Sequence, residues 1–449
     1  MTTSPTPTIA VRSRSRAPAT AIHIPPVEKT DIIVSVPSAN ITPGQQAILD
    51  AAFAKPKAKG KAKKGEAAEP VDAKPKTELE AIMGEIRDKK GPKTVFLGTQ
   101  LPLFNLVSTG AFTLDLALLG GVSEGQCAMF YGWENSGKTT MLLRVVASLQ
   151  RKHPDKVVVW VDAETTLDRD WAVKHGVDLQ RLVILQPESG EDAVDMIKSM
   201  LDTWEVCGVV VDSIPALVPQ KQSDRSAADN AAPAELARLV GFMCSDILKS
   251  WVKERKRGHW VTVLLANQFR SKITMFGDPR SIPGGNQLKY LVTTRVERKN
   301  KEVGANEAAK GKDADATQKE AAKKAAMDCV SVNEHTFKIT KAKLTSIRAG
   351  EFQMVVDPEH PLGMGTFLDA PVVVAFAKKM GIVQGGGSSW RVECIDEFDG
   401  MKFGNLAAIC DALYQEPVAF LELKRHIIGL TREAKGMPYL PPDNHLIRW

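Results

Sequence analysis

The sequence lacks the features of a membrane protein and of a disulfide-bonded framework. Its 449 residues contain no uninterrupted apolar run that approaches 18 residues, so no transmembrane helix is expected. Its six cysteines lie far apart and form no CxxC pair, which argues against a zinc ribbon, a redox pair or a secreted disulfide scaffold. We expect scattered core thiols in a reducing cytoplasm.

Most of the chain also lacks an excess of charge of either sign. The net charge is +6, and residues 1–76 carry all of it, with 12 Lys+Arg against 6 Asp+Glu. The other 373 residues hold 47 of each kind, so the folded part must bind any polyanion through local patches. The 43% hydrophobic content is enough for at least one large core.

Residues 1–76 are rich in Pro, Ala, Ser, Thr and Lys, and this composition predicts a disordered basic tail. The lysine-rich stretch 55–64 repels itself and has nothing to bury. The first 27 residues contain three arginines and no acid, which leaves an organellar transit peptide as a second interpretation. The tail either touches nucleic acid through phosphate charge or only keeps the protein in solution.

Four segments are expected along the chain. After the tail, residues 77–105 form an N-terminal helix and linker, with Thr77 as the helix cap and apolar residues at helical spacing. This helix packs either on its own core or on a neighbouring subunit. Residues 106–365 form the main domain, interrupted at 299–328 by an Ala/Lys/Asp/Glu insertion that is mobile or helical. Residues 366–449 form a small mixed α/β domain and tail.

The main domain alternates apolar runs with helical patterns. The predicted strands are residues 126–131, 157–162, 207–212 and 261–267, and the predicted helices are 139–151, 191–204 and 233–254. Nearly continuous apolar strands are typical of parallel strands that are buried on both faces. The alternation therefore predicts an α/β fold with a doubly wound, mostly parallel sheet.

The strongest motif is GxxxxGK[ST], which lies between a predicted strand and a predicted helix. Its residues are Gly132, Glu134, Asn135, Ser136, Gly137, Lys138, Thr139 and Thr140. In this context the backbone amides and the helix N-terminus bind a polyphosphate. Lys138 is expected to contact the β- and γ-phosphates of ATP, and the Thr139 hydroxyl to hold Mg²⁺.

Polar residues end the other predicted strands. Asp212 closes an apolar strand and is expected to support Mg²⁺, as in a Walker B strand. Glu164 follows the second strand, where it could act as general base on an attacking water, and Gln268 follows the fourth, where it could sense the γ-phosphate. Ligands bind at the carboxyl ends of such strands, so these groups should converge on one nucleotide. The alternative for each residue alone is a local strand-end cap.

The motifs GWENSGKTT, VDAETTLD, VVVDS, ANQFRSK, MFGDPRSIPGGNQLKY and KITKAKL, in this order, resemble the bacterial-type RecA recombinases. The resemblance runs from about residue 77 to residue 429. It implies a RecA-type P-loop ATPase core. It also implies an ATP- and Mg²⁺-dependent protein that assembles helical filaments of itself on single-stranded DNA and exchanges strands with a homologous duplex.

The resemblance assigns roles to individual residues. Glu164, Asp212 and Gln268 match the catalytic glutamate, the Walker B aspartate and the glutamine that links the γ-phosphate to a DNA-binding loop. Further matches are Asp168 and Trp171, which fall where the family contacts adenine, and Lys341 and Lys343, which match paired lysines that reach the neighbouring subunit's ATP. Without the resemblance, the two lysines would be interpreted as a solvated strand face.

Two loops resemble the family's DNA-binding loops, one at about 219–233 and one at 269–283. The residues implied to bind DNA are Arg238, Arg270, Lys272, Ile273, Met275, Phe276, Arg280, Gly284, Gly285 and Asn286. Cations for phosphates, with apolar groups to wedge between bases, suit single-strand binding. The alternative is an ordinary surface loop. Lys289 and Tyr290 match an interface position that passes the nucleotide signal between subunits.

Several positions depart from the family pattern. Tyr290 stands where phenylalanine is usual, Ser245 where a second arginine is usual, and Trp171 where tyrosine is common. The acidic C-terminal tail of many bacterial members is not present, and a basic N-terminal segment is. These departures suggest a divergent member, viral or organellar. Two other functions remain open: a hexameric DNA motor of RecA fold, and an ATP-gated scaffold on single strands.

Overall fold

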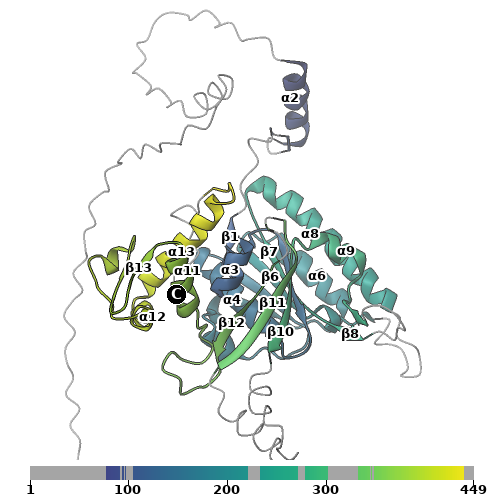
Figure 1. Ribbon diagram of the computed structural model, residues 1–449. Helices are drawn as coiled ribbons and strands as arrows, with labels where there is room; N and C mark the ends of the chain where they lie inside the picture. Colours follow the sequence, from purple (N-terminus) through teal and green to yellow (C-terminus); the bar gives the residue numbers. More distant parts are fainter. Residues whose placement is uncertain are drawn as a thin grey trace, which may run out of the picture. The chain divides into compact units, whose positions relative to one another are not determined.

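The computed structural model describes residues 77–91, 94, 95, 97, 105–220, 233–271, 279–301, 332–343, 345 and 348–438 (Figure 1). All of these residues belong to one compact unit, Lys76–Trp449. The predicted tail at 1–76, the insertion beyond residue 301 and most of the first predicted DNA loop lie outside the described residues.

An eight-stranded mixed sheet forms the centre of the described unit (Figure 1). Its strands, in spatial order, are β12 (Ala349–Val355), β11 (Val332–Lys341), β10 (Thr294–Lys301), β3 (Cys127–Gly132), β7 (Thr262–Gln268), β6 (Val206–Asp212), β4 (Val157–Asp162) and β5 (Leu182–Leu185). Pairing is parallel from β10 to β5 and antiparallel for β11 and β12. The fold is therefore the predicted α/β class with a mostly parallel sheet.

Helices cover both faces of the sheet, as expected for a doubly wound fold. One face packs against α3 (Phe112–Leu118) and α4 (Lys138–Lys152) in a core that includes Trp160. The other face packs against α6 (Gly190–Leu201), α8 (Pro233–Arg257) and α9 (Gly285–Leu291). Because both faces are covered, the central strands are buried throughout, which explains their nearly continuous apolar sequence.

The four predicted strands are confirmed within one residue at each end. Four boundaries were predicted wrongly: α6 ends at Leu201 instead of residue 204, and α8 ends at Arg257 instead of residue 254. In addition, β10 continues to Lys301 into the predicted insertion, and β11 begins at Val332 instead of near residue 336. The short strand β5 was not predicted at all. Val183 and Ile184 of β5 are partly exposed because the strand lies at the edge of the sheet, so it lacks a buried run.

A smaller helical layer follows the sheet in the chain. It contains α11 (Ala370–Lys379), α12 (Leu406–Gln415), α13 (Pro417–Glu433) and a hairpin of β13 (Val383–Gly386) and β14 (Ser389–Val392). Its apolar core includes Phe112 and Leu116 of α3. Buried Asp369 accepts hydrogen bonds from the Phe112 backbone at 3.1 Å and from Lys424 at 2.9 Å, which joins this layer to the main domain.

The N-terminal helix α2 (Glu78–Lys90) begins at the predicted cap. Thr77 and Glu80 form a capping box, with each side chain bonded to the other residue's backbone N–H. Leu79 is 61% exposed and Ile82 49% exposed, and the helix buries none of its residues against the described core. Within the described ranges, no helix combines the length and the apolar character that crossing a membrane requires.

Candidate active site

A cavity of about 600 Å³ opens at the carboxyl ends of the parallel strands. The phosphate-loop motif forms one wall, the ends of β4, β6 and β7 form another, and β10 to β12 form a third. Its lining residues are Glu134, Asn135, Ser136, Gly137, Lys138, Thr139, Thr140, Glu164, Thr166, Trp171, Asp212, Gln268, Asn300, Asn333, His335, Met354 and Val356. The strand-end groups that the sequence predicted to converge therefore share one cavity.

The motif forms a tight loop between β3 and α4. Gly137 is the N-cap of α4 with a φ of 77°, a conformation that L side chains rarely adopt. A β-carbon on Gly132 would lie 2.7 Å from the Ser136 hydroxyl oxygen, so a larger residue would displace the loop. Lys138 donates to the Trp133 carbonyl at 2.9 Å, and burial lowers its pKa. A buried cation at a helix N-terminus matches the chemistry of a polyphosphate.

Thr139 and Asp212 meet across the cavity floor. The Thr139 hydroxyl donates to Asp212 Oδ2 at 2.8 Å. Burial raises the pKa of Asp212 to about 6, although the Thr139 hydrogen bond opposes the shift. A hydroxyl and a carboxylate are the oxygen ligands that Mg²⁺ prefers, so these two side chains fit a magnesium ion.

Glu164 lies at the centre of a polar contact group. Its Oε1 accepts a hydrogen bond from the Ser213 hydroxyl and lies 3.4 Å from Gln268 Nε2. The preceding Asp162 accepts from the backbone N–H groups of Thr166 and Leu167, which holds the loop that carries Glu164. The contact with Ser213 was missed from the sequence, although its place directly after Asp212 was the available signal.

The two residues expected at adenine have different positions. Trp171 lines the cavity and donates from its indole N–H to the Thr140 hydroxyl at 3.3 Å. Asp168 is the N-cap of α5 (Arg169–Lys174) and accepts from the Trp171 backbone N–H at 2.7 Å. Asp168 is not among the described residues that line the cavity. Its carboxylate instead caps the helix that carries Trp171.

Lys341 and Lys343 lie away from this chain's own cavity. Lys341 ends β11 and donates to the Lys289 backbone carbonyl at 2.6 Å. Burial and the nearby charges of Lys343 and Arg295 lower the pKa of Lys341. Tyr290, next to Lys289, is 81% exposed. The structure thus groups both predicted lysines with the predicted interface residues.

Only the base of the second predicted DNA loop is described. It is a pair of antiparallel strands of two residues each, β8 (Arg270–Ser271) and β9 (Arg280–Ser281). Arg280 lies over the Phe269 ring at 4.9 Å and bonds Glu297 at 3.1 Å. The Phe269 ring also lies 5.4 Å from Trp133 in the phosphate loop, so packed aromatic groups connect the two loops.

The other predicted DNA contacts divide into two sets. Lys272, Ile273, Met275 and Phe276 lie outside the described residues. Arg238 is exposed on α8, and Asn286 accepts from Lys289 at 3.1 Å. Gly284 and Gly285 have positive φ, and a β-carbon on Gly285 would lie 3.0 Å from Ala237 of α8. Close packing of α9 on α8 therefore requires glycine at this point.

The third cavity wall was missed from the sequence. Asn300, Asn333 and His335 line it from β10 and β11. The Asn300 amide also donates to the backbone carbonyl of Asn135 in the phosphate loop. No motif marks these residues. The available signal was the pairing of β10 with β11, which are separated in the chain by the predicted insertion. This pairing places Asn300 opposite His335.

Comparison with known proteins agrees with this geometry. The family described as RecA N-terminal domain matches residues 77–335, more than half of the chain. Protein RecA of Mesomycoplasma hyopneumoniae strain J is 34% identical over 226 residues, which are 49% of this chain and 65% of the relative. Protein RecA of Rhizobium rhizogenes strain K84 is 36% identical over 224 residues, covering 49% and 60%.

Protein RecA of Leptospira meyeri is similar at 34% identity over 227 residues, which are 49% of this chain and 57% of the relative. The matched part of the chain therefore spans about three fifths of the length of these curated relatives. Since the family match covers more than half of its residues, this protein belongs to the RecA family.

Proposed function

We propose that this protein is a DNA-dependent ATPase and recombinase. It assembles helical filaments on single-stranded DNA and promotes homologous pairing and strand exchange with duplex DNA. Membership of the RecA family supports this proposal. The observation that carries it is the cavity in which the Thr139–Asp212 pair and the Glu164–Gln268 pair face the phosphate loop.

Each side chain of the cavity has a separate role in ATP hydrolysis. Lys138 binds the β- and γ-phosphates, and Trp171 offers its ring to the adenine. Thr139 and Asp212 hold Mg²⁺, which neutralises phosphate charge when bound. Glu164 accepts the proton of the attacking water, and the Ser213 hydroxyl orients its carboxylate. Gln268 contacts Glu164 and begins the segment toward the second DNA loop, so it can report the state of the γ-phosphate.

Assembly completes the site between subunits. Lys341 and Lys343 reach the ATP of the neighbouring subunit and stabilise negative charge on the transferred phosphoryl group, as an arginine finger does. Their place beside Lys289 and Tyr290, away from their own cavity, supports a role in trans. The exposed apolar side chains of α2 support docking of residues 77–105 on a neighbour. The core at 106–365 binds nucleotide and DNA, and residues 366–449 form the small domain.

DNA binding depends on the two loops. Arg238, Arg270 and Arg280 contact phosphates, with Lys272 in the second loop. Ile273, Met275 and Phe276 contact bases without sequence preference, and the segment Gly284–Asn286 ends the loop. The link from Trp133 through Phe269 to Arg280 supports coupling between nucleotide and DNA.

The test is ATP hydrolysis with and without single-stranded DNA, with electron microscopy of the same samples. Wild type should show strong DNA stimulation on helical filaments, and Lys341→Ala should lose it while still binding ATP. Lys379→Ala, an exposed lysine of α11, is the matched control and should behave as wild type. Closed rings with turnover indifferent to DNA and to Lys341 would favour a motor. Normal filaments with negligible turnover would favour a scaffold.

A further inference from the structure

Three buried polar side chains lie together beneath the phosphate loop. We call them the basal cluster: Ser136, Arg298 and His335. Their exposed fractions are 2%, 1% and 3%, so each is nearly removed from water. Ser136 belongs to the loop itself, whereas Arg298 and His335 come from the neighbouring strands β10 and β11. None of the three has a role in the mechanism above.

The cluster touches the loop at Gly137. A β-carbon on Gly137 would lie 3.1 Å from Arg298 Nη2 and 3.5 Å from His335 Cε1. Arg298 pairs with Gly132 across the parallel strands β10 and β3, so both ends of the motif adjoin it. Ser136, Gly137 and His335 also line the nucleotide cavity. The guanidinium is therefore separated from the cavity by the thickness of the loop.

Five polar atoms of the cluster have no hydrogen-bond partner in the part of the chain that the structure describes. Ser136 Oγ, Arg298 Nε and Nη1, and both ring nitrogens of His335 are buried without a hydrogen bond. The contact described for the guanidinium is the Phe352 ring, 4.3 Å from Arg298 Cζ, and His335 packs on the same ring. A buried charge without a partner strongly destabilises the fold of a typical protein.

The charge state of the cluster follows from its burial. Burial lowers the pKa of Arg298 to about 9, so the guanidinium stays charged at neutral pH. Burial and the Arg298 charge lower the pKa of His335 to about 4, so its imidazole is neutral. No carboxylate shifts the pKa of Arg298, so no acid in the described structure neutralises it. The cluster carries one positive charge.

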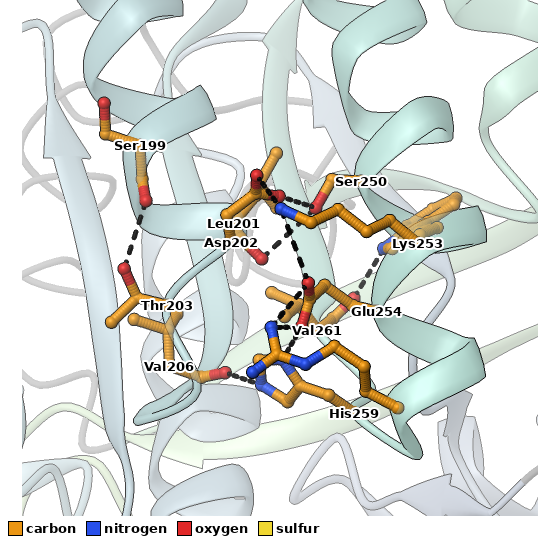
Figure 2. Close-up of polar contacts among 12 residues, drawn as sticks. Ser199, Leu201, Asp202, Thr203, Val206, Ser250, Lys253, Glu254, His259 and Val261 are labelled. Carbon is orange, nitrogen blue, oxygen red and sulfur yellow. Dashed lines mark hydrogen bonds and ion pairs between the residues drawn. The ribbon is translucent and has the colours of Figure 1, made fainter.

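Two other buried groups of the same kinds are partnered, although both ring nitrogens of buried His175 lack a hydrogen bond among the described residues. Arg144 also lies over an aromatic ring, Phe367 at 4.7 Å, but it donates to the Gly365 carbonyl. His259 contacts Glu254 through one ring nitrogen and the Val206 carbonyl through the other (Figure 2). The described structure therefore supplies partners to some buried cations and imidazoles, but not to His175 or to the cluster beside the phosphate loop.

We propose that Arg298 is a positioning residue that holds a fixed positive charge behind the phosphate loop and thereby strengthens binding of the nucleotide's polyphosphate. This inference rests on the proposed nucleotide function. The phosphates are the missing counter-charge, and they act on the guanidinium across the backbone of Gly137. Because the surroundings are apolar, the attraction is screened far less than it would be in water. Phe352 packs against the guanidinium and keeps it in place, and His335 packs on the same ring.

The test uses the full-length protein and two matched substitutions. Arg298→Met keeps an apolar stem and removes the charge, and Arg144→Met does the same to the partnered arginine. Two quantities are measured for each: the thermal midpoint without nucleotide, and the Kd for Mg·ATP by fluorescence titration. Arg298→Lys and Lys138→Ala complete the set.

Arg298→Met should weaken Mg·ATP about tenfold and leave the nucleotide-free midpoint unchanged or higher, because an unpaired charge is removed. Arg144→Met should lower the midpoint and leave Kd within about twofold, since its partner lies outside the cavity. Arg298→Lys should bind Mg·ATP better than Arg298→Met, because it keeps the charge.

A lower midpoint in Arg298→Met, with the same Kd for Mg·ATP in Arg298→Met and Arg298→Lys, would overturn the inference and make Arg298 a structural residue. If Arg298→Met does not fold, a tenfold weaker Kd in Arg298→Lys, which keeps the charge, would overturn it as well. An unchanged Kd in a folded Arg298→Met would also overturn it, while the proposed function stands if Lys138→Ala loses binding. A wild type that binds no Mg·ATP would overturn both.

Discussion

Buried charged side chains at the two ends of the central sheet differ in whether they have ion-pair partners. At the amino ends of the strands, Glu254 is 1% exposed and is surrounded by cations and donors, as Figure 2 shows. It accepts from Arg257 at 3.0 Å and contacts His259 at 3.2 Å. At the carboxyl ends, Asp212 and Arg298 are also buried, at 7% and 1% exposure, but neither has an ion pair within the described ranges.

The pKa values express the same difference. Burial alone would raise the pKa of Glu124, at the amino end, but contacts with His153 and Lys152, both at 2.6 Å, lower it to about 2. Burial raises the pKa of Asp212, at the carboxyl end, to about 6, and the Thr139 hydrogen bond offsets only part of that rise. We infer that the amino end stabilises the fold, whereas the carboxyl end keeps charges ready for a ligand.

The largest effect is expected from a change at the carboxyl end. Glu164→Gln removes the proposed general base and should lower DNA-stimulated ATP hydrolysis by about 10²–10⁴-fold, with Mg·ATP binding retained. Steady-state hydrolysis and equilibrium titration measure the two quantities. Glu254→Gln at the other end is the control, and its turnover per folded molecule should equal that of wild type. Equal losses in both variants would remove the distinction between the ends.

The next effect concerns stability and its pH dependence. Glu124 has a folded-state pKa of about 2 against an ordinary value of 4.5, so its contribution is present above pH 4.5 and lost as the pH falls toward 2. Glu124→Gln should therefore lower the free energy of unfolding by about 3 kcal/mol at pH 7. Urea unfolding at several pH values measures the difference in the free energy of unfolding between the variant and wild type. This difference should decrease below pH 4.5. A difference in the free energy of unfolding that does not change with pH would contradict the ion-pair explanation.

A smaller loss of stability is expected at Glu254. Glu254→Gln keeps the shape but weakens the charged contacts with Arg257 and His259. We expect a loss of about 2 kcal/mol in the free energy of unfolding, because His259 is fully buried beside it. Denaturant unfolding measures this loss. Glu85→Gln, which removes an exposed pair with Lys89 in α2, should change stability by less than about 0.5 kcal/mol.

The smallest effect is expected at the rim of the cavity. Trp171→Ala should weaken Mg·ATP by about 1 kcal/mol, or roughly fivefold, through loss of ring contact with the base. Trp171→Tyr should restore most of the affinity. Since Trp171 is only partly buried, the thermal midpoint without nucleotide should change little. A fall in midpoint with unchanged Kd would make Trp171 a packing residue of α5.

The sequence predicted the carboxyl end of the sheet better than its edge. Thr139 was found from the phosphate-loop motif. Glu164, Asp212 and Gln268 were found because each lies at the end of a nearly continuous apolar strand, and parallel strands end at one edge. The same rule does not apply to the antiparallel strands β11 and β12. There, polar and apolar residues alternate and a long segment separates the partners β10 and β11 in the chain.

Arg298 illustrates what the sequence could not show. In the stretch Val296-Glu-Arg-Lys-Asn300 it reads as one of several exposed strand charges. Its burial arises from tertiary packing: α4 begins over it and Phe352 of β12 lies beneath it. Likewise, Asp168 was assigned to the ligand from a motif, whereas its helix-cap geometry became visible only with the backbone of α5.

The most direct test compares Asp212→Asn with Glu124→Gln at pH 7, measuring the free energy of unfolding with and without Mg·ATP. A saturating ligand at a hundred times its Kd should add about 2.7 kcal/mol to the wild type. We predict that Asp212→Asn is at least as stable as wild type without ligand and loses most of the ligand's contribution. Glu124→Gln should be less stable and keep that contribution in full. The reverse pattern, or the same response in both variants, would contradict the division of the sheet into a stabilising end and a ligand-binding end.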